Sequence, residues 1–251
     1  ANAKDQAPAW QLGLFGGAYK PAISSDQAQK DHYELFYGAD AYLFDDAPVM
    51  IGFESTWYFW NKFGLAGVQT KMGMWAVKGQ ARRCLSGDAS DPETNYINCD
   101  ANEPATLTNT EKGSTSTQFQ VLPLQIGLVY RATYLHDRWG IPLEAYVKGG
   151  LDYFFWWSTT GGQPASRPAI GDDDKKDGSG GPAGYHLGAG LSFNLDWLDP
   201  QTAARGRATR GLAGSYLFFE ANSLVVAGFD DAPRLDLSAT QYSMGIAIDF
   251  Q

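Results

Sequence analysis

The stretch IPLEAYVKGGLDYFFWW, residues 141–157, decides the fold class of this chain. Read with a period of two, its charged residues Glu144, Lys148 and Asp152 all fall into one set, and the other set is apolar. Side chains alternate between the two faces of a strand, whereas a helix would carry two glycines in its middle. A strand this long exceeds the ~5–6 residues common in soluble proteins, and a tilted membrane strand needs about 9–11 residues. The stretch is therefore predicted to be a strand with one apolar and one polar face.

The same alternation recurs along the chain. The other stretches that show it are AWQLGLFGGAYK (9–20), VMIGFESTWYFW (49–60), LAGVQTKMGMWAV (65–77), QVLPLQIGLVYRATYL (120–135), AGYHLGAGLSFNLDWL (183–198), SYLFFEANS (215–223) and LSATQYSMGIAIDFQ (237–251). No amphipathic helices remain to cover the apolar faces, and lipid can cover them only if every backbone group is paired by closure of the sheet. A soluble lipocalin-like barrel would have the opposite polarity. We therefore predict an all-β, eight-stranded, antiparallel, up-and-down transmembrane barrel, with residues 1–251 forming one domain.

Bulk composition is compatible with that fold. Mean hydropathy is −0.30, and no apolar run reaches the ~18 residues of a transmembrane helix. A transmembrane barrel gives only a weak hydropathy signal, because its apolar and polar residues alternate. The net charge of −9 argues against a nucleic acid partner.

The connections predict an orientation. Short turns at 61–64 and 136–140 alternate with longer loops at about 21–48, 81–115, 160–183 and 228–236. In bacterial barrels the long loops are extracellular, so both termini are expected in the periplasm. Residues 199–211 fall on a periplasmic turn, where Asp199 followed by Pro200 predicts a capped short helix whose arginines lie near lipid headgroups or a periplasmic partner. Residues 32–48 are also strand-like, and counting them leads to the alternative of ten strands.

Two sets of residues are expected to mark the membrane and the lumen. Aromatic residues near strand ends predict an interfacial girdle: Trp57, Phe59, Trp139, Tyr153, Phe155, Trp157, Trp197 and Tyr242. Inward-facing charges predict a lumen network: Glu54, Lys71, Arg131, Glu144, Lys148, Asp152, Glu220 and Asp249. Buried charges must pair, and an eight-stranded barrel is just wide enough for side chains to fill. We expect these residues to plug the lumen, and the alternative is a narrow ion path.

Other chemistry is sparse. Cys84 and Cys99 lie in one polar stretch and are expected to form a disulfide, as an oxidising periplasm or cell surface permits. Of the three histidines, His186 is inward but six residues from Ser192, too far along one strand for a hydrogen bond. The loop GDDDKKDGSGG at 171–181 lacks the calcium-loop spacing. We therefore expect no catalytic residues, no metal site and no cofactor.

The last strand, SATQYSMGIAIDF, resembles the C-terminal signature of bacterial outer-membrane barrels, in which alternating apolar residues end in an aromatic residue. The resemblance implies that Phe250 is read by the barrel assembly machinery, although the pattern usually ends on Phe itself and here Gln251 follows. The stretches VLPLQIGLVYRATYLHDRWGIPLEAYVKGGLDYFFWW and LDPQTAARGRATRGLAGSYLFFEANSL further resemble a family of small, largely uncharacterised outer-membrane barrels, of OmpA or OmpX size, from delta-type proteobacteria. These motifs are structural, so the resemblance implies a fold and a membrane but no activity.

The expected function is therefore non-enzymatic. We expect a monomeric barrel of a Gram-negative outer membrane with a filled lumen, which acts as a structural or interaction protein of the cell envelope, either an anchor or a subunit of a complex. Its expected partners are the lipid bilayer, lipopolysaccharide, the assembly machinery and a further envelope protein. The alternatives are a small ion or solute channel and a lipid-modifying enzyme.

Overall fold

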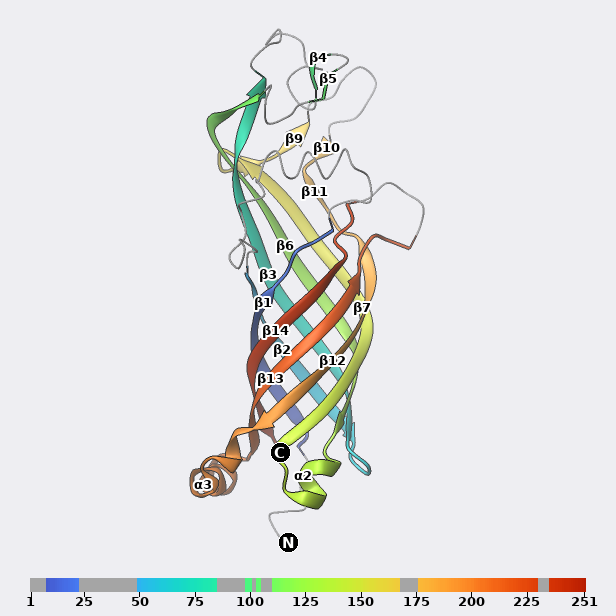
Figure 1. Cartoon of the computed structure of the whole chain (residues 1–251), viewed down its shortest axis with the longest axis vertical. Helices are drawn as coiled ribbons and strands as arrows, with labels where there is room; N and C mark the ends of the chain where they lie inside the picture. The colour runs from blue at the N-terminus through green and yellow to red at the C-terminus, as the bar shows by residue number, and fades with distance from the viewer. Residues whose placement is uncertain are drawn as a thin grey trace.

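The computed structural model describes residues 8–22, 49–84, 98–100, 103–104, 110–167, 176–229 and 235–251. Eight long strands form the body: β1 (Trp10–Ala18), β2 (Val49–Trp60), β3 (Leu65–Cys84), β6 (Thr110–Ala132), β7 (Leu143–Thr160), β12 (Ala183–Asn194), β13 (Leu212–Val225) and β14 (Ala239–Phe250). Each pairs antiparallel with its neighbour in the chain (Figure 1). The predicted strand at 141–157 is β7, which begins and ends slightly later than expected.

The sheet closes on itself because β14 also pairs with β1. Phe250 is the register partner of Trp10 on one side and of Leu212 on the other, so the last strand lies between β1 and β13. The predicted eight-stranded antiparallel barrel is confirmed. Two short strands, β8 (Gln163–Pro164) and β11 (Ser179–Gly180), add to β7 outside the closed ring. Residues 32–48, on which the ten-stranded alternative depended, lie outside the described residues.

Helical turns gather at the end of the barrel that carries Trp10 and Phe250, here called the helical end (Figure 1). They are α2 (Tyr134–Trp139), the single 3-10 turn η1 (Leu195–Trp197) and α3 (Pro200–Arg210). The predicted helix at 199–211 is confirmed. Asp199 accepts a hydrogen bond from the Thr202 N–H at 3.0 Å, and Gly211 ends the helix in the left-handed conformation at φ 65°. The expected turn at 136–140 is instead part of α2, which begins at Tyr134.

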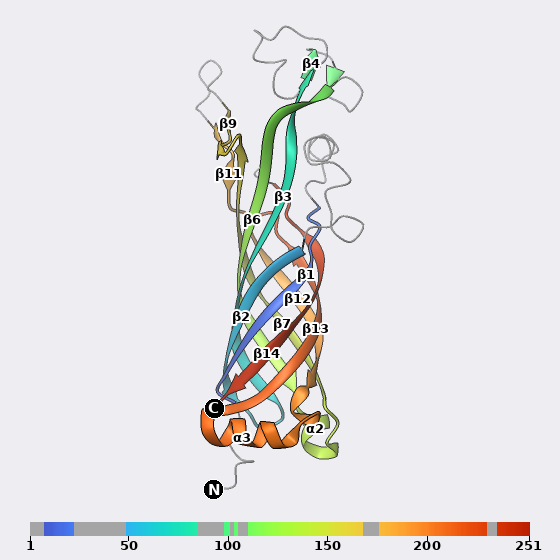
Figure 2. The same cartoon turned by 90° about the vertical axis from the view of Figure 1, so that its left-hand side faces the viewer.

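Strand length differs sharply around the barrel. β3 and β6 are the longest strands, and they continue past the rim opposite the helical end, here called the loop end (Figure 2). Above Thr117, where β7 ends its pairing with β6, β6 pairs with β3 alone up to the partners Cys84 and Thr110. The predicted loop at 81–115 is therefore shorter than expected, because its first and last residues belong to this two-stranded ribbon. The remaining short strands β4 (Asn98–Asp100) and β5 (Glu103–Pro104), and β9 (Ser166–Arg167) and β10 (Lys176–Asp177), form two small pairs in the loop regions.

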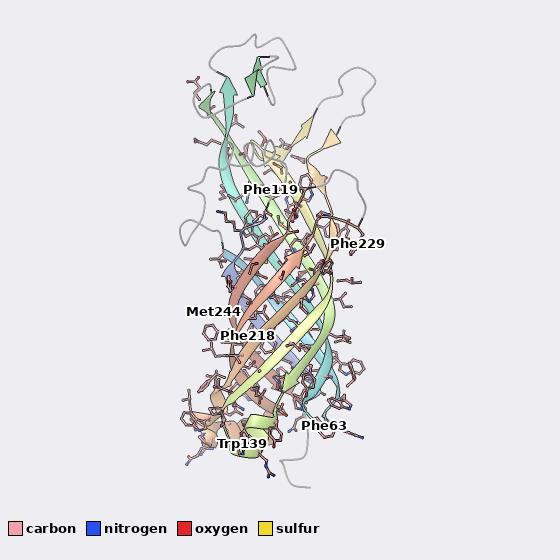
Figure 3. All side chains as sticks on the ribbon, turned by 45° about the vertical axis from the view of Figure 1, so that its right-hand side comes forward. Phe63, Phe119, Trp139, Phe218, Phe229 and Met244 are labelled. Carbon is pink, nitrogen blue, oxygen red and sulfur yellow. The ribbon has the colours of Figure 1, made fainter. Side chains whose placement is uncertain are left out.

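The barrel wall is apolar outside and polar inside. On β14, Tyr242, Met244, Ile246 and Ile248 are exposed, whereas Gln241, Ser243 and Asp249 between them are buried. The same alternation holds on β7, where Leu151 is 61% exposed and its neighbour Asp152 is 4% exposed. Phe63 and Trp139 lie at the helical end and Phe229 near the loop end (Figure 3). The apolar set is therefore the exterior of a closed sheet rather than a core.

Candidate functional site

The polar interior is the candidate site, since it holds the charges that the sequence singles out. Glu54, Lys71, Arg131, Glu144, Lys148, Asp152, Glu220 and Asp249 are each at most 5% exposed. Six of the eight long strands contribute them, and the hydrogen-bonded register brings them into three groups along the barrel.

The first group centres on Glu220 of β13. Its Oε2 accepts hydrogen bonds from Lys148 Nζ at 2.5 Å and the Tyr146 hydroxyl at 3.2 Å. Its Oε1 accepts from Lys71 Nζ, from Asn222 Nδ2 at 2.8 Å and from Ser243 Oγ at 2.9 Å. One carboxylate therefore joins an ammonium group from β3, on the opposite side of the barrel, to one from β7, which is separated from β13 only by β12, through short, charge-assisted contacts.

Phe15 and Glu54 complete this group. Lys71 lies over the Phe15 ring, with Nζ 3.9 Å from the ring centroid, so it gains a cation–π contact as well as its ion pair. Glu54 faces Lys71 across the β2–β3 pair, and its carboxylate lies against Gly13, where an added Cβ would come within 2.9 Å of Glu54 Cγ. Glu54 and Glu220 together balance Lys71 and Lys148, and the group is neutral as a whole.

The second group centres on Arg131, near the helical end. Its guanidinium forms ion pairs with Glu144, at 3.2 Å from Nε to Oε2, and with Asp249. Its Cζ atom lies 4.7 Å from the Tyr216 ring centroid and 5.2 Å from that of Tyr58. A planar cation between two rings and two carboxylates is held in one orientation.

The third group is small and was not expected as a unit. His186 Nδ1 lies 2.6 Å from Asp152 Oδ1, and Gln125 Nε2 donates to the same oxygen at 3.0 Å. The sequence placed His186 and Asp152 on inward faces but could not pair them, because their contact depends on the register of β7 with β12. Both side chains are buried.

An aromatic cluster closes the lumen toward the loop end, and sequence reasoning missed most of it. It consists of Tyr19, Trp75, Phe119, Phe154 and Trp156. The Tyr19 and Trp75 rings meet edge to face at 5.6 Å, and the Tyr19 hydroxyl donates to the Leu237 carbonyl at 2.6 Å. Tyr19, Trp75 and Phe154 are at most 1% exposed. For the members that lie on strands, the signal that could have found the cluster was an apolar inward side chain on a strand otherwise lined by polar residues.

Little free space remains among the polar groups. One cavity of about 10 Å³ lies among Gln11, Glu54, Tyr58, Arg131 and Tyr146, enough for about one water molecule. Glu54, which lines this cavity, has a buried Oε2 atom with no hydrogen-bond partner within the described part of the protein.

The other predicted site residues vary in how far the structure describes them. Seven of the girdle residues are exposed, and Trp157 is half-buried. The side chains of Cys84 and Cys99 lie outside the described part of the chain, so the disulfide stays a prediction. So does the role of Phe250 in assembly, although its pairing at the barrel seam is described above. Residues 171–175 of the acidic loop also lie outside the described residues.

Among the described residues, no group of three or more histidine, cysteine or acidic side chains could hold a metal ion. Separately, no helix in the described segments is long and apolar enough to cross a membrane.

Comparisons with known proteins can be set beside this geometry. No family model and no curated protein matches the chain. Among solved structures, it is similar to the N-terminal β-barrel domain of Pseudomonas aeruginosa OprF, with 9% identity, 98% of each chain covered and a TM-score of 0.37. It is also similar to a major outer membrane protein from Thermus thermophilus, with 14% identity, 96% of this chain and 100% of that chain covered, and a TM-score of 0.36. These values are too low to carry an argument, so the barrel fold rests on the strand pairing described above.

Proposed function

We propose that this chain is a non-enzymatic β-barrel of the bacterial outer membrane with a closed lumen, which acts as an anchor or as a subunit of an envelope complex. The exterior supports the membrane location. Leu14, Leu128, Leu151 and Leu187 are each more than 60% exposed on four different strands. So large an apolar surface would promote aggregation in water, whereas contact with lipid chains covers it.

The proposed orientation and family follow from weaker observations. The helical end, with its short connections, would face the periplasm, and the long ribbon of β3 and β6 would face outward, as in bacterial barrels. The C-terminal strand resembles the outer-membrane signature, and the delta-type proteobacterial family remains a proposal carried by the quoted stretches alone.

The closed lumen is the observation that carries the non-channel role. Passage along the axis would require the Glu220 group, the Arg131 group and the aromatic cluster to open together, because each spans the interior at a different level. Separating the Arg131 or Glu220 ion pairs would leave uncompensated buried charges, which is costly. A polypeptide that fills its own lumen has only its rims and its outer wall for interaction.

The test is single-channel recording of the purified, refolded chain in a planar bilayer. We expect no conductance steps from protein that is shown to be inserted by heat-modifiable migration. A Trp75→Ala, Phe154→Ala double variant, still folded by the same migration assay, should also remain silent, because the Glu220 and Arg131 groups still fill the lumen. Regular steps from the unmodified chain would contradict the proposal and favour the small channel.

The lipid-modifying enzyme has a separate readout. If the chain carried that activity, overexpression in its native membrane would change the mass of lipid A. We expect an unchanged lipid A spectrum, because His186 is enclosed beside Asp152 in a lumen that lacks room for a substrate.

A further inference from the structure

A groove lies at the helical end between α3 and the outer wall of β13 and β14. It has a volume of about 510 Å³. Arg205, Thr209 and Arg210 of α3 form one side, and Leu212, Ser215 and Ile248 of the barrel wall form the other. Ser215 and Ile248 are register partners on the outward face of the sheet. The groove is therefore part of the exterior and does not open into the lumen.

The position of α3 is fixed by a carboxylate and a glycine. Asp196 accepts hydrogen bonds from Arg207 Nη1 at 2.9 Å, from the Ser215 N–H at 3.1 Å and from Ser215 Oγ at 2.8 Å. Gly206 faces Leu212, where an added Cβ would lie 3.3 Å from Leu212 Cδ1. The helix lies across the base of the barrel (Figure 2). This geometry suits a segment that lies in the plane of a membrane surface.

The charges that border the groove leave two arginines available. Asp196 is engaged by Arg207 and Ser215, and Asp199 accepts from the Thr202 N–H at the start of the helix. Arg205 and Arg210 are exposed, and α3 has no acidic residue of its own. The unmatched charge at the groove is therefore positive, next to an apolar wall. An anionic headgroup phosphate followed by an acyl chain complements these two features in the same order.

The neighbouring surface indicates lipid rather than protein as the occupant. Ile246 and Ile248, which continue the groove floor up the wall, are 53% and 39% exposed. Trp197 and Leu198, just before α3, are 60% and 64% exposed. Exposed Trp beside a basic segment is typical of a membrane–water interface. The groove is thus continuous with the band that contacts lipid.

We propose that this groove binds the phosphodiester headgroup of an anionic phospholipid, with Arg205 and Arg210 contacting the phosphate and Leu212 and Ile248 contacting the start of an acyl chain. The inference rests on the membrane location in the proposed function. It adds a lipid-selective site at the helical end, which the closed lumen does not require.

The test is native mass spectrometry of the full chain, released from micelles that contain equal amounts of dioleoyl phosphatidylglycerol and dioleoyl phosphatidylcholine. We expect the unmodified chain to retain phosphatidylglycerol preferentially. In Arg205→Gln and Arg210→Gln variants the preference should fall by roughly fivefold for each arginine removed, as for basic residues at an anionic surface. Arg138→Gln is the matched control, because Arg138 is an exposed arginine of α2 at the same end.

Several outcomes would overturn the proposal. One is a double variant that prefers phosphatidylglycerol as strongly as the unmodified chain does. Another is an unmodified chain that retains both lipids equally. Displacement of phosphatidylglycerol by millimolar inorganic phosphate would indicate a general anion site instead of a lipid site. Copurification of a protein that is lost in the double variant, with lipid retention unchanged, would assign the groove to a protein partner. Absence of lipid preference in unmodified protein that inserts into vesicles overturns this inference alone, whereas failure of the unmodified protein to insert overturns the proposed membrane function as well.

Discussion

The two ends of the lumen are closed by different chemistry. Toward the helical end and in the middle, Arg131, Lys71 and Lys148 are matched to carboxylates by distance and direction. Toward the loop end, Trp75 and Phe154 fill the lumen with apolar rings packed against Tyr19. Volume filling tolerates exchange of one apolar shape for another, whereas an ion pair loses its balance when either partner changes. The charged region should therefore be the less tolerant of conservative substitution.

The largest loss of stability is expected for Glu220→Gln. It keeps the shape of the side chain but leaves Lys71 and Lys148 without their shared carboxylate, so we expect a loss of about 3–5 kcal/mol in the free energy of unfolding. Urea unfolding of the refolded barrel in lipid vesicles, followed by Trp fluorescence, measures it. Lys62→Gln, at an exposed turn residue, is the control and should unfold as the parent does. A loss below about 1 kcal/mol would mean that the ion pairs do not close the lumen.

A smaller effect is expected for Arg131→Lys, which preserves the charge. Lysine cannot contact both Glu144 and Asp249 with a planar fork, nor stack between Tyr58 and Tyr216. We expect a loss of about 2 kcal/mol in the same unfolding experiment, within the range for hydrogen bonds to charged groups. Unchanged stability would show that charge alone, without geometry, is sufficient at the helical end.

The aromatic cluster should tolerate the matching conservative change. Phe154→Leu replaces one buried apolar side chain by another and leaves no charge unpaired, so we expect a loss of about 1 kcal/mol. A loss as large as that of Glu220→Gln would erase the distinction between the two regions. Conductance recording of the same variant should remain silent, because Tyr19 and Trp75 still meet across the lumen.

The smallest effect is expected outside the barrel, at the start of α3. Hydrogen bonds from the Thr202 N–H hold the pKa of the Asp199 carboxyl below its ordinary value. A depressed pKa means that the capping contribution is present above the ordinary pKa and is lost as the pH falls through the lowered one. Hydrogen exchange of the α3 amides should therefore speed up at acid pH relative to the intrinsic rate. Asp199→Ala should show that faster exchange already at neutral pH; if its exchange matches the parent, the cap contributes nothing measurable.

Alternation alone predicted most of the fold, and the reasons are physical. A period of two places Asp152 and Leu151 on opposite faces whatever the register, and the demand for backbone pairing in lipid then requires closure. Asp199 and Pro200 predicted α3 because capping is local. The sequence did not predict that β3 and β6 would extend past the rim, since polar residues near Arg82 read equally well as a loop.

The sequence predicted which charged residues belong to the candidate site, but it did not predict which of them pair with each other. Alternation along each strand is enough to predict which charged residues face inward. Which acid meets which base depends on the register between strands and on contacts across the barrel, and Lys71 with Glu220 is such a contact, made between residues 149 positions apart. Tyr19 was missed because it follows the end of β1, where alternation no longer defines a face.

The ribbon of β3 and β6 gives the molecule a mechanical property. From Thr117 to Thr110 it rises past the last β7 contact by roughly 20 Å at the usual ~3.3 Å per residue. Both of its strands continue into the barrel wall, where β3 pairs with β2 and β6 with β7. A pull on the far end of the ribbon would run along these strands, across hydrogen bonds that lie perpendicular to them. The load would be carried in shear by many bonds at once, so tension applied at the far end of the ribbon would be transmitted to the barrel without separating its strands one bond at a time.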